Sequence, residues 1–185
     1  MKFDKIAAAV FLSLGMATSG AYAADTQGSG TVTFTGNIID APCSINPSSA
    51  KQTVELGSIA SAALAKEGKS NSREFTIELE NCSLADNSSE EETRAADAKS
   101  VTVTFGGQTA TGTDLLGITG TASGAGVGII DASGKQVVIG QASAAQTLLE
   151  NDNTMVFSAY LQGLKSATIV PGDFTSIANF TLDYQ

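Results

Sequence analysis

The sequence predicts an all-β sandwich, and three observations support this fold class. Short segments in which apolar and polar residues alternate recur along the chain, as expected for strands with one buried face. Turn-forming Gly, Asn and Ser residues separate these segments. No convincing helical period and no internal repeat interrupts the pattern. The seven expected body strands lie at 52–56, 73–81, 101–105, 127–130, 136–139, 155–161 and 174–184, and 115–118 is a short apolar piece in a region rich in Gly, Thr and Ser.

The first 23 residues have the three parts of a secretory signal peptide. Lys2 and Lys5 supply the positive start, residues 6–16 form a short apolar stretch, and Ala21-Tyr22-Ala23 is a small-x-small cleavage site. No other apolar run approaches the roughly 20 residues of a membrane-spanning helix. We expect residues 1–23 to be removed during export, and the remaining chain to be soluble.

The composition disfavours several classes of partner. The chain has 10 basic and 19 acidic residues, no histidine and a net charge of −9. Without the signal peptide, eight basic and 18 acidic residues remain, a net charge of −10. An acidic exported protein is a poor candidate for binding nucleic acid or anionic membranes. The polar run at 83–100, with Glu90-Glu91-Glu92 at its middle, lacks the spacing of an EF-hand and is expected to be a solvated loop.

The two cysteines, Cys43 and Cys82, predict a disulfide, because they are even in number in an exported chain. The segment 73–81 alternates apolar residues with glutamates and ends at Cys82, so the bond is expected to tie this strand to the one that carries Cys43. Two cysteines are too few for a zinc site, and histidine ligands are absent. We expect no metal and no cofactor.

The N-terminal segment at 24–39 carries an apolar stripe without a core of its own. Val32, Phe34 and Ile38 share one face of an extended chain, and the opposite face is polar. Gly36 interrupts the stripe, and a glycine weakens a strand unless another backbone must come close at that point. Two interpretations stay open here: an arm that fills a groove, and an ordinary edge strand with a glycine bulge.

The C-terminal segment reads as a strong strand up to the last residue. Ala178, Phe180, Leu182 and Tyr184 line one face, opposite polar residues. Chain termini normally fray, so something must hold this strand in place.

Taken in order, these segments resemble the structural subunits of chaperone–usher fimbriae (type 1 and P-type pilins), especially major shaft subunits of the mannose-resistant kind. The resemblance covers nearly the whole mature chain. Gly172 and Tyr184 also match the family pattern of a glycine fourteenth from the end and a tyrosine next to last. The matching segments are Val32-x-Phe34-x-Gly36-x-Ile38, residues 39–45 (Ile-Asp-Ala-Pro-Cys-Ser-Ile), 70–75, Glu80-Asn81-Cys82, Pro171-Gly172-Asp173-Phe174 and Tyr184-Gln185.

This resemblance implies an immunoglobulin-like sandwich at 40–185 that lacks its last strand and so leaves an open groove. The arm of a neighbouring subunit, with Val32, Phe34 and Ile38, is implied to fill that groove, and Gly36 to pass a tight spot. The implied partners are identical or related pilin subunits in a head-to-tail polymer, a periplasmic chaperone and an outer-membrane usher. The implied groove and chaperone-contact residues are Gly172, Ala178, Phe180, Leu182, Tyr184 and Gln185.

The function expected from this resemblance is a structural subunit, of the major kind, in a surface fimbria that supports bacterial adhesion. One alternative is a self-contained binding module such as a tip lectin, and another is a minor or adaptor subunit. Tip adhesins carry an additional domain and lack the arm, which disfavours the first alternative. An enzyme is disfavoured because histidine is absent, both cysteines are expected to be oxidised, and no carboxylate pair lies in a recognisable motif.

Overall fold

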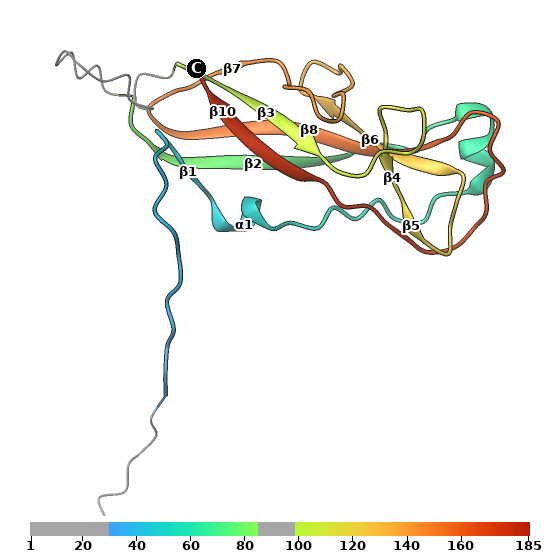
Figure 1. Ribbon diagram of the computed structural model, residues 1–185, viewed down its shortest axis with the longest axis horizontal. Coiled ribbons are helices and arrows are strands. Elements are labelled where there is room, and N and C mark those ends of the chain that lie inside the picture. Colours follow the sequence, from blue (N-terminus) through green and yellow to red (C-terminus); the bar gives the residue numbers. More distant parts are fainter. Residues whose placement is uncertain (1–29, 85–98) are drawn as a thin grey trace, which may run out of the picture. The chain divides into compact units, whose positions relative to one another are not determined.

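The computed structural model describes residues 30–84 and 99–185, and the strands in this part of the chain are all paired antiparallel (Figure 1). The chain separates into two compact units, Met1–Ile38 and Ile39–Gln185. The expected signal peptide, the start of the arm at 24–29 and the glutamates at 90–92 lie outside the described residues. The prediction of an all-β fold is confirmed.

The larger sheet has five strands in the order β1-β2-β8-β6-β4. The strand β8 is central, as its almost continuous apolar sequence predicts, because both of its edges pair with long neighbours. Ile77 and Leu79 of β2 are fully buried, which confirms the inward face predicted for this strand. The strands are β1 (Ser44–Ile45), β2 (Arg73–Cys82), β8 (Asn151–Gly163), β6 (Ala125–Asp131) and β4 (Leu116–Gly117).

A second sheet contains β10 (Asn179–Tyr184), β3 (Ser100–Gly106) and β7 (Gln146–Thr147), in that order. The β10–β3 ladder runs from the pair Asn179 and Gly106 to the pair Tyr184 and Val101. A small separate ladder joins β5 (Thr119–Gly120) to β9 (Phe174–Thr175). Helical structure among the described residues is limited to α1 (Pro47–Ala50) and the 3-10 turns of η1 (Ser61–Glu67).

Both sheets contribute to one core, which makes the unit a sandwich. Val101 and Val103 of the smaller sheet are as fully buried as Met155 of β8, and all three belong to the same apolar cluster. Phe105 of β3 bridges the layers, because its ring packs edge-on against Phe157 of β8 with centroids 5.0 Å apart.

The disulfide between Cys43 and Cys82 is present, with Cα atoms 4.1 Å apart, and it joins the start of β1 to the end of β2 as predicted. The bond closes a loop with a sequence separation of 39 residues. In the chain-entropy account, constraining a loop of this length in the unfolded state contributes about 3–4 kcal/mol.

Three expected strands differ from the structure. Residues 52–56 alternate in burial but form no ladder, and 136–139 make only the single bridge between Gln136 and Ile130. The expected terminal strand at 174–184 is split into β9 and β10 by residues 176–178. Alternation requires only one buried face, whereas a strand also requires a neighbouring backbone with which to share hydrogen bonds. Residues 52–56 have one partly buried face but share no ladder with a neighbouring backbone among the described residues.

Candidate functional site

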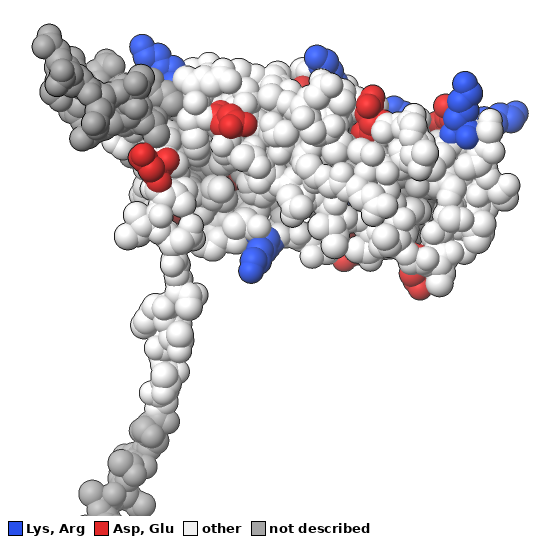
Figure 2. Space-filling model, viewed as in Figure 1, with Lys and Arg blue, Asp and Glu red and all other residues white. Residues whose placement is uncertain are grey.

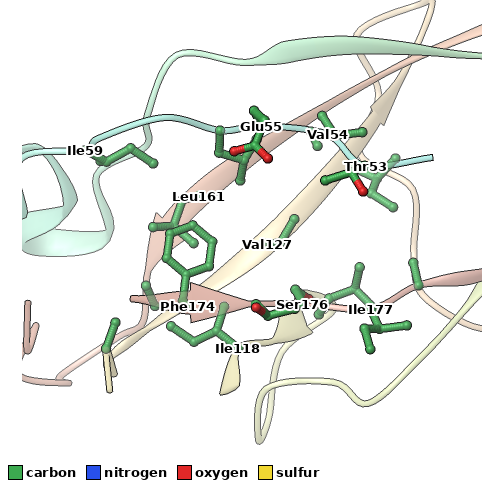
Figure 3. Close-up of a pocket in the computed structure, with 18 of the residues that line it drawn as sticks. Thr53, Val54, Glu55, Ile59, Ile118, Val127, Leu161, Phe174, Ser176 and Ile177 are labelled. Carbon is green, nitrogen blue, oxygen red and sulfur yellow. The ribbon is translucent and has the colours of Figure 1, made fainter. Parts of the chain in front are cut away.

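A groove of about 1220 Å³ opens in the unit Ile39–Gln185 between two segments that are distant in sequence (Figure 3). Residues 49–59 line one side and residues 169–180 line the other. Side chains of the core, including Phe75, Phe105 and Val127, line its floor. The groove is therefore an opening into the apolar interior of the sandwich.

The first wall keeps the side-chain pattern of a strand without its hydrogen bonds. Val54 and Leu56 are half-buried and pack against the core, whereas Thr53 and Glu55 are exposed. The side chain of Gln52 attaches this wall to the large sheet, because its amide donates to the carbonyl of Thr76 at 3.0 Å. The backbone of the wall is thus available to another strand.

The second wall begins at Val170 and continues into β10. The strand β10 is the last in its sheet and pairs only with β3 among the described residues. The free edge of such a strand presents unpaired N–H and C=O groups. Ile177 is 71% exposed and Val170 is 44% exposed, although both are large apolar residues on the groove. Water-exposed apolar surface beside a free edge is the arrangement that an added strand would cover.

The structure brings three of the expected groove residues together, namely Gly172, Ala178 and Phe180. Gly172 lies so close to the neighbouring loop that a Cβ atom there would be 2.5 Å from Thr121 Oγ1. Phe180 packs against the core, with its ring centroid 6.5 Å from that of Phe105.

The other three expected residues lie further along β10 and do not line the groove. Leu182 and Tyr184 are half-buried and pack against the core. Burial raises the pKa of the Tyr184 phenol, because the charged form loses hydration. A terminal oxygen of Gln185 accepts hydrogen bonds from the backbone N–H groups of Lys99 at 2.7 Å and Ser100 at 2.9 Å. These bonds hold the chain terminus in place.

The described part of the arm has an exposed apolar stripe. Val32, Phe34 and Ile38 are 74%, 89% and 103% exposed. Residues 30–39 are assigned to no strand, and both interpretations of this segment, a groove-filling arm and an edge strand with a glycine bulge, stay predictions. A Cβ atom at Gly36 would have no described atom within 4 Å.

The family resemblance implies a groove beside the C-terminal strand and does not identify the other wall. The signal for that wall was the alternation of Val54 and Leu56 followed by Gly57, which was interpreted as an ordinary strand. Ile177 was also missed, because it lies on the polar side of the C-terminal alternation but reaches the groove where β9 and β10 are interrupted.

The described residues contain no group of three or more acidic, cysteine or histidine side chains placed to hold a metal ion. Among the helices at 30–84 and 99–185, none is long and apolar enough to cross a membrane.

Comparison with known proteins agrees with this architecture. The sequence pattern of the family described as "Fimbrial protein" matches residues 32–185. The chain is 52% identical to the Fimbria A protein of Serratia marcescens and 50% identical to the Major MR/P fimbria protein of Proteus mirabilis, in each case over 100% of both chains.

Two solved structures are also similar. A chain from a chaperone–usher pilus is 32% identical with a TM-score of 0.75, covering 86% of this chain and 97% of that one. The P pilus rod subunit PapA is 30% identical with a TM-score of 0.69, covering 78% of this chain and 100% of that one. The pilin fold implied by the sequence is thereby confirmed. The chain belongs to the fimbrial protein family, as a structural subunit of a surface fimbria and not an enzyme.

Proposed function

We propose that this chain polymerises by donor-strand exchange, in which the arm of one subunit completes the groove of the next. The observation that carries the proposal is the match between the two surfaces. The groove lacks a strand beside β10, and the arm supplies an exposed stripe of Val32, Phe34 and Ile38. Strand addition of this kind, for which pilins are an established example, gains affinity from the main chain and specificity from alternate side chains.

The energetics favour insertion of the arm. Burying three large apolar side chains contributes about 5–9 kcal/mol before the costs of association, at 1.5–3 kcal/mol for each side chain. The added strand also satisfies backbone groups along the free edge of β10 and covers Ile177. Gly36 interrupts the apolar stripe of the arm, and a close approach to the groove of a neighbouring subunit accounts for the lack of a side chain there.

The arm and the groove are different surfaces, so the contact is head-to-tail and propagates as an open filament. Removal of residues 1–23 on export would leave the arm at the start of the mature chain. A periplasmic chaperone would occupy the groove first and hold the carboxylate of Gln185, and an outer-membrane usher would exchange the chaperone for the next arm. The names of the Major MR/P fimbria protein and of the P pilus rod subunit support a major, rod-forming role for this chain.

A self-contained binding module is the second candidate. It predicts a stable monomer on gel filtration without a chaperone, whereas the exposed arm and open groove favour association. A minor or adaptor subunit would use the same contacts at a different place in the fimbria.

The direct test compares Gly36→Leu with the matched control Thr35→Leu, which adds the same side chain to the opposite face of the arm. Neither residue belongs to the sandwich, so both variants are expected to accumulate in complex with the chaperone. Electron microscopy of surface material is expected to show no fibres for Gly36→Leu and normal fibres for Thr35→Leu. Normal fibres from Gly36→Leu would refute the proposal.

A further inference from the structure

The two ends of the unit Ile39–Gln185 carry charges of opposite sign. At the end that contains η1, the exposed side chains of Lys66, Lys69 and Lys165 outnumber those of Glu67 and Asp173. Figure 2 shows blue side chains gathered at this end. At the end that contains the disulfide, Asp40, Glu150, Asp152 and the carboxylate of Gln185 outnumber Lys99. A basic end is unusual in a chain with a net charge of −9.

Hydrogen bonds show which residues share the basic end. The backbone N–H of Gly163 donates to the carbonyl of Gly68 at 3.0 Å, and that of Leu164 donates to Gly124 at 2.8 Å. These bonds hold η1 and the segment carrying Lys165 beside the start of β6.

A different set of bonds assembles the acidic end. The backbone N–H of Ser83 donates to Pro42 at 2.9 Å, and that of Leu84 donates to the Glu150 carboxylate at 3.1 Å. The disulfide and the terminal residue of the chain lie at the same end, because Leu148 and Gln185 both bond to Lys99.

The acidic end also exposes apolar side chains that the groove does not use. Leu149 is 66% exposed and Ile39 is 51% exposed, and neither lines the groove. Ion pairs around exposed apolar residues are typical of the rim and centre of a protein–protein contact.

The direction of an added strand brings these two ends together. Every ladder in the described sheets is antiparallel, and antiparallel pairing is the more stable kind. The strand β10 runs from the η1 side toward the acidic end, so an antiparallel arm would place Ile38 at the η1 end of its acceptor. Only residues 39–42 then separate Ile38 from Cys43 of the donor, and the five steps from Ile38 to Cys43 span about 17 Å when extended.

We propose that the acidic end of each subunit docks against the η1 end of the subunit that accepts its arm, with Asp40 and Asp152 facing Lys66 and Lys165. This docking rests on donor-strand exchange, and its occupant is a second copy of the chain. A short tether raises the effective concentration of one end near the other. Exposed ion pairs are individually weak, so the contact orients successive subunits while the arm supplies most of the affinity.

Carbodiimide treatment of intact fibres tests this contact, because the reagent joins a lysine amine to a carboxylate only when the two are in direct contact. The paired residues lie at opposite ends of one unit, so a bond between them must join two subunits. We expect mass spectrometry to find Lys66 and Lys165 joined to Asp40 or Asp152. The yield is expected to fall several-fold when salt rises from about 0.01 M to about 1 M, which shortens the screening length from roughly 30 Å to 3 Å.

Two sets of variants complete the test. Lys66→Arg with Lys165→Arg keeps the charge but removes the reactive amine, and is expected to lower these cross-links at least fivefold, whereas the control Lys135→Arg leaves them unchanged. Lys66→Glu with Lys165→Glu is expected to lower fibre yield about threefold, and adding Asp40→Lys with Asp152→Lys to restore it. If wild-type fibres lack these cross-links, or if the added Asp40→Lys and Asp152→Lys do not restore the fibre yield, the proposed docking is wrong, while donor-strand exchange still stands. Absence of fibres from the wild-type chain would overturn donor-strand exchange as well.

Discussion

Gly128 of β6 lies directly opposite Tyr160 of β8, and the phenol ring of Tyr160 fills the space that a side chain at position 128 would need. A Cβ atom at Gly128 would be 2.4 Å from Cζ of Tyr160. The ring is only 3% exposed although its neighbours Ala159 and Leu161 point to the core on the other face of the strand. Its hydroxyl contacts Lys69 at 3.3 Å and Gln136 at 3.1 Å.

Replacing Gly128 with Val is therefore expected to displace this ring and destabilise the subunit by about 1–3 kcal/mol. Urea unfolding followed by circular dichroism measures the effect. A double-mutant cycle with Tyr160→Ala provides the control, because the clash disappears when the ring is absent and the two changes should not be additive. Additive effects would contradict the close packing of this pair.

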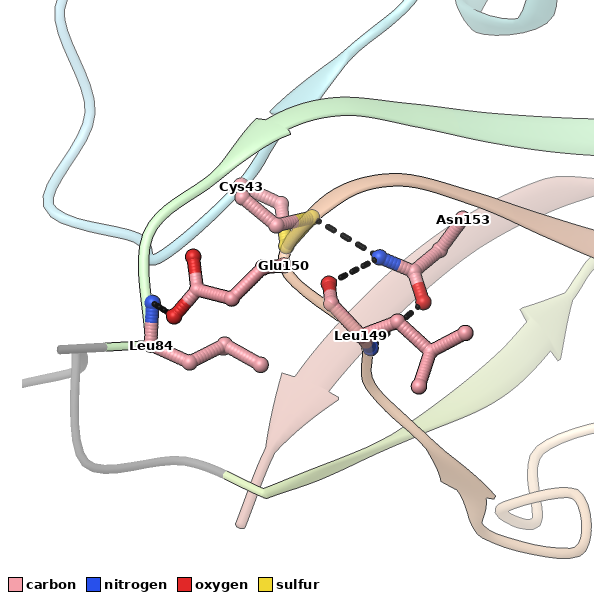
Figure 4. Close-up of a disulfide and its surroundings, with 6 residues drawn as sticks. Cys43, Leu84, Leu149, Glu150 and Asn153 are labelled. Carbon is pink, nitrogen blue, oxygen red and sulfur yellow. Dashed lines mark hydrogen bonds between the residues drawn. A yellow bond between two sulfur atoms is a disulfide. The ribbon is translucent and has the colours of Figure 1, made fainter.

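Asn153 connects the disulfide to the turn that precedes β8 (Figure 4). The Asn153 side chain is only 6% exposed. Its oxygen accepts a hydrogen bond from the Leu149 N–H at 2.8 Å. Its amide nitrogen donates to the Leu149 carbonyl at 2.7 Å and to Cys82 Sγ at 3.2 Å. Asn153→Ala leaves both Leu149 groups without this partner and is expected to cost about 1–3 kcal/mol of unfolding free energy. The exposed neighbour Asp152 supplies the control, since Asp152→Ala should change stability by no more than about 0.5 kcal/mol.

Tyr184 makes the stability of the subunit sensitive to alkaline pH. Burial raises the pKa of its phenol above the value in the unfolded chain, which is about 10. The stabilising contribution is fully present below pH 10 and is lost as the pH rises through the folded pKa. Tyr184→Phe removes this ionisation, so the wild type is expected to lose stability relative to the variant above about pH 10. Parallel loss of stability in both proteins, measured by thermal unfolding across this range, would contradict the prediction.

Substituting Ile177 is expected to affect assembly without affecting the folding stability of the subunit. The side chain is 71% exposed on the groove, so Ile177→Ser should change the stability of the unassembled subunit by no more than about 0.5 kcal/mol. If an added strand covers the residue, the same change weakens binding of a synthetic arm peptide by up to about 1.5–3 kcal/mol. The conservative variant Ile177→Val serves as control and should bind nearly as tightly as the wild type. Equal peptide affinity for all three proteins would show that the arm does not reach Ile177.

The sequence alone determined the features that depend on local pattern and composition. Alternation identified β2, β3 and the terminal strand β10, because burying one face of a strand requires a period of two residues. The almost continuous apolar sequence of 155–161 identified β8. The even number of cysteines in an exported chain predicted the bond between Cys43 and Cys82. The same reasoning marked Val32, Phe34 and Ile38 as an apolar stripe without a core, and these residues are exposed in the structure.

Only the tertiary structure decided which segments face one another. Residues 52–56 have the pattern of a strand, yet they form a groove wall because no backbone lies beside them among the described residues. Tertiary structure also brings Tyr160 close to Gly128, although the two residues are distant in sequence. In the same way it places Lys66 and Lys165 at one end of the unit. Side-chain period is set within a few consecutive residues, whereas a hydrogen-bonded ladder, a groove and a charged end require the chain to return to the same place.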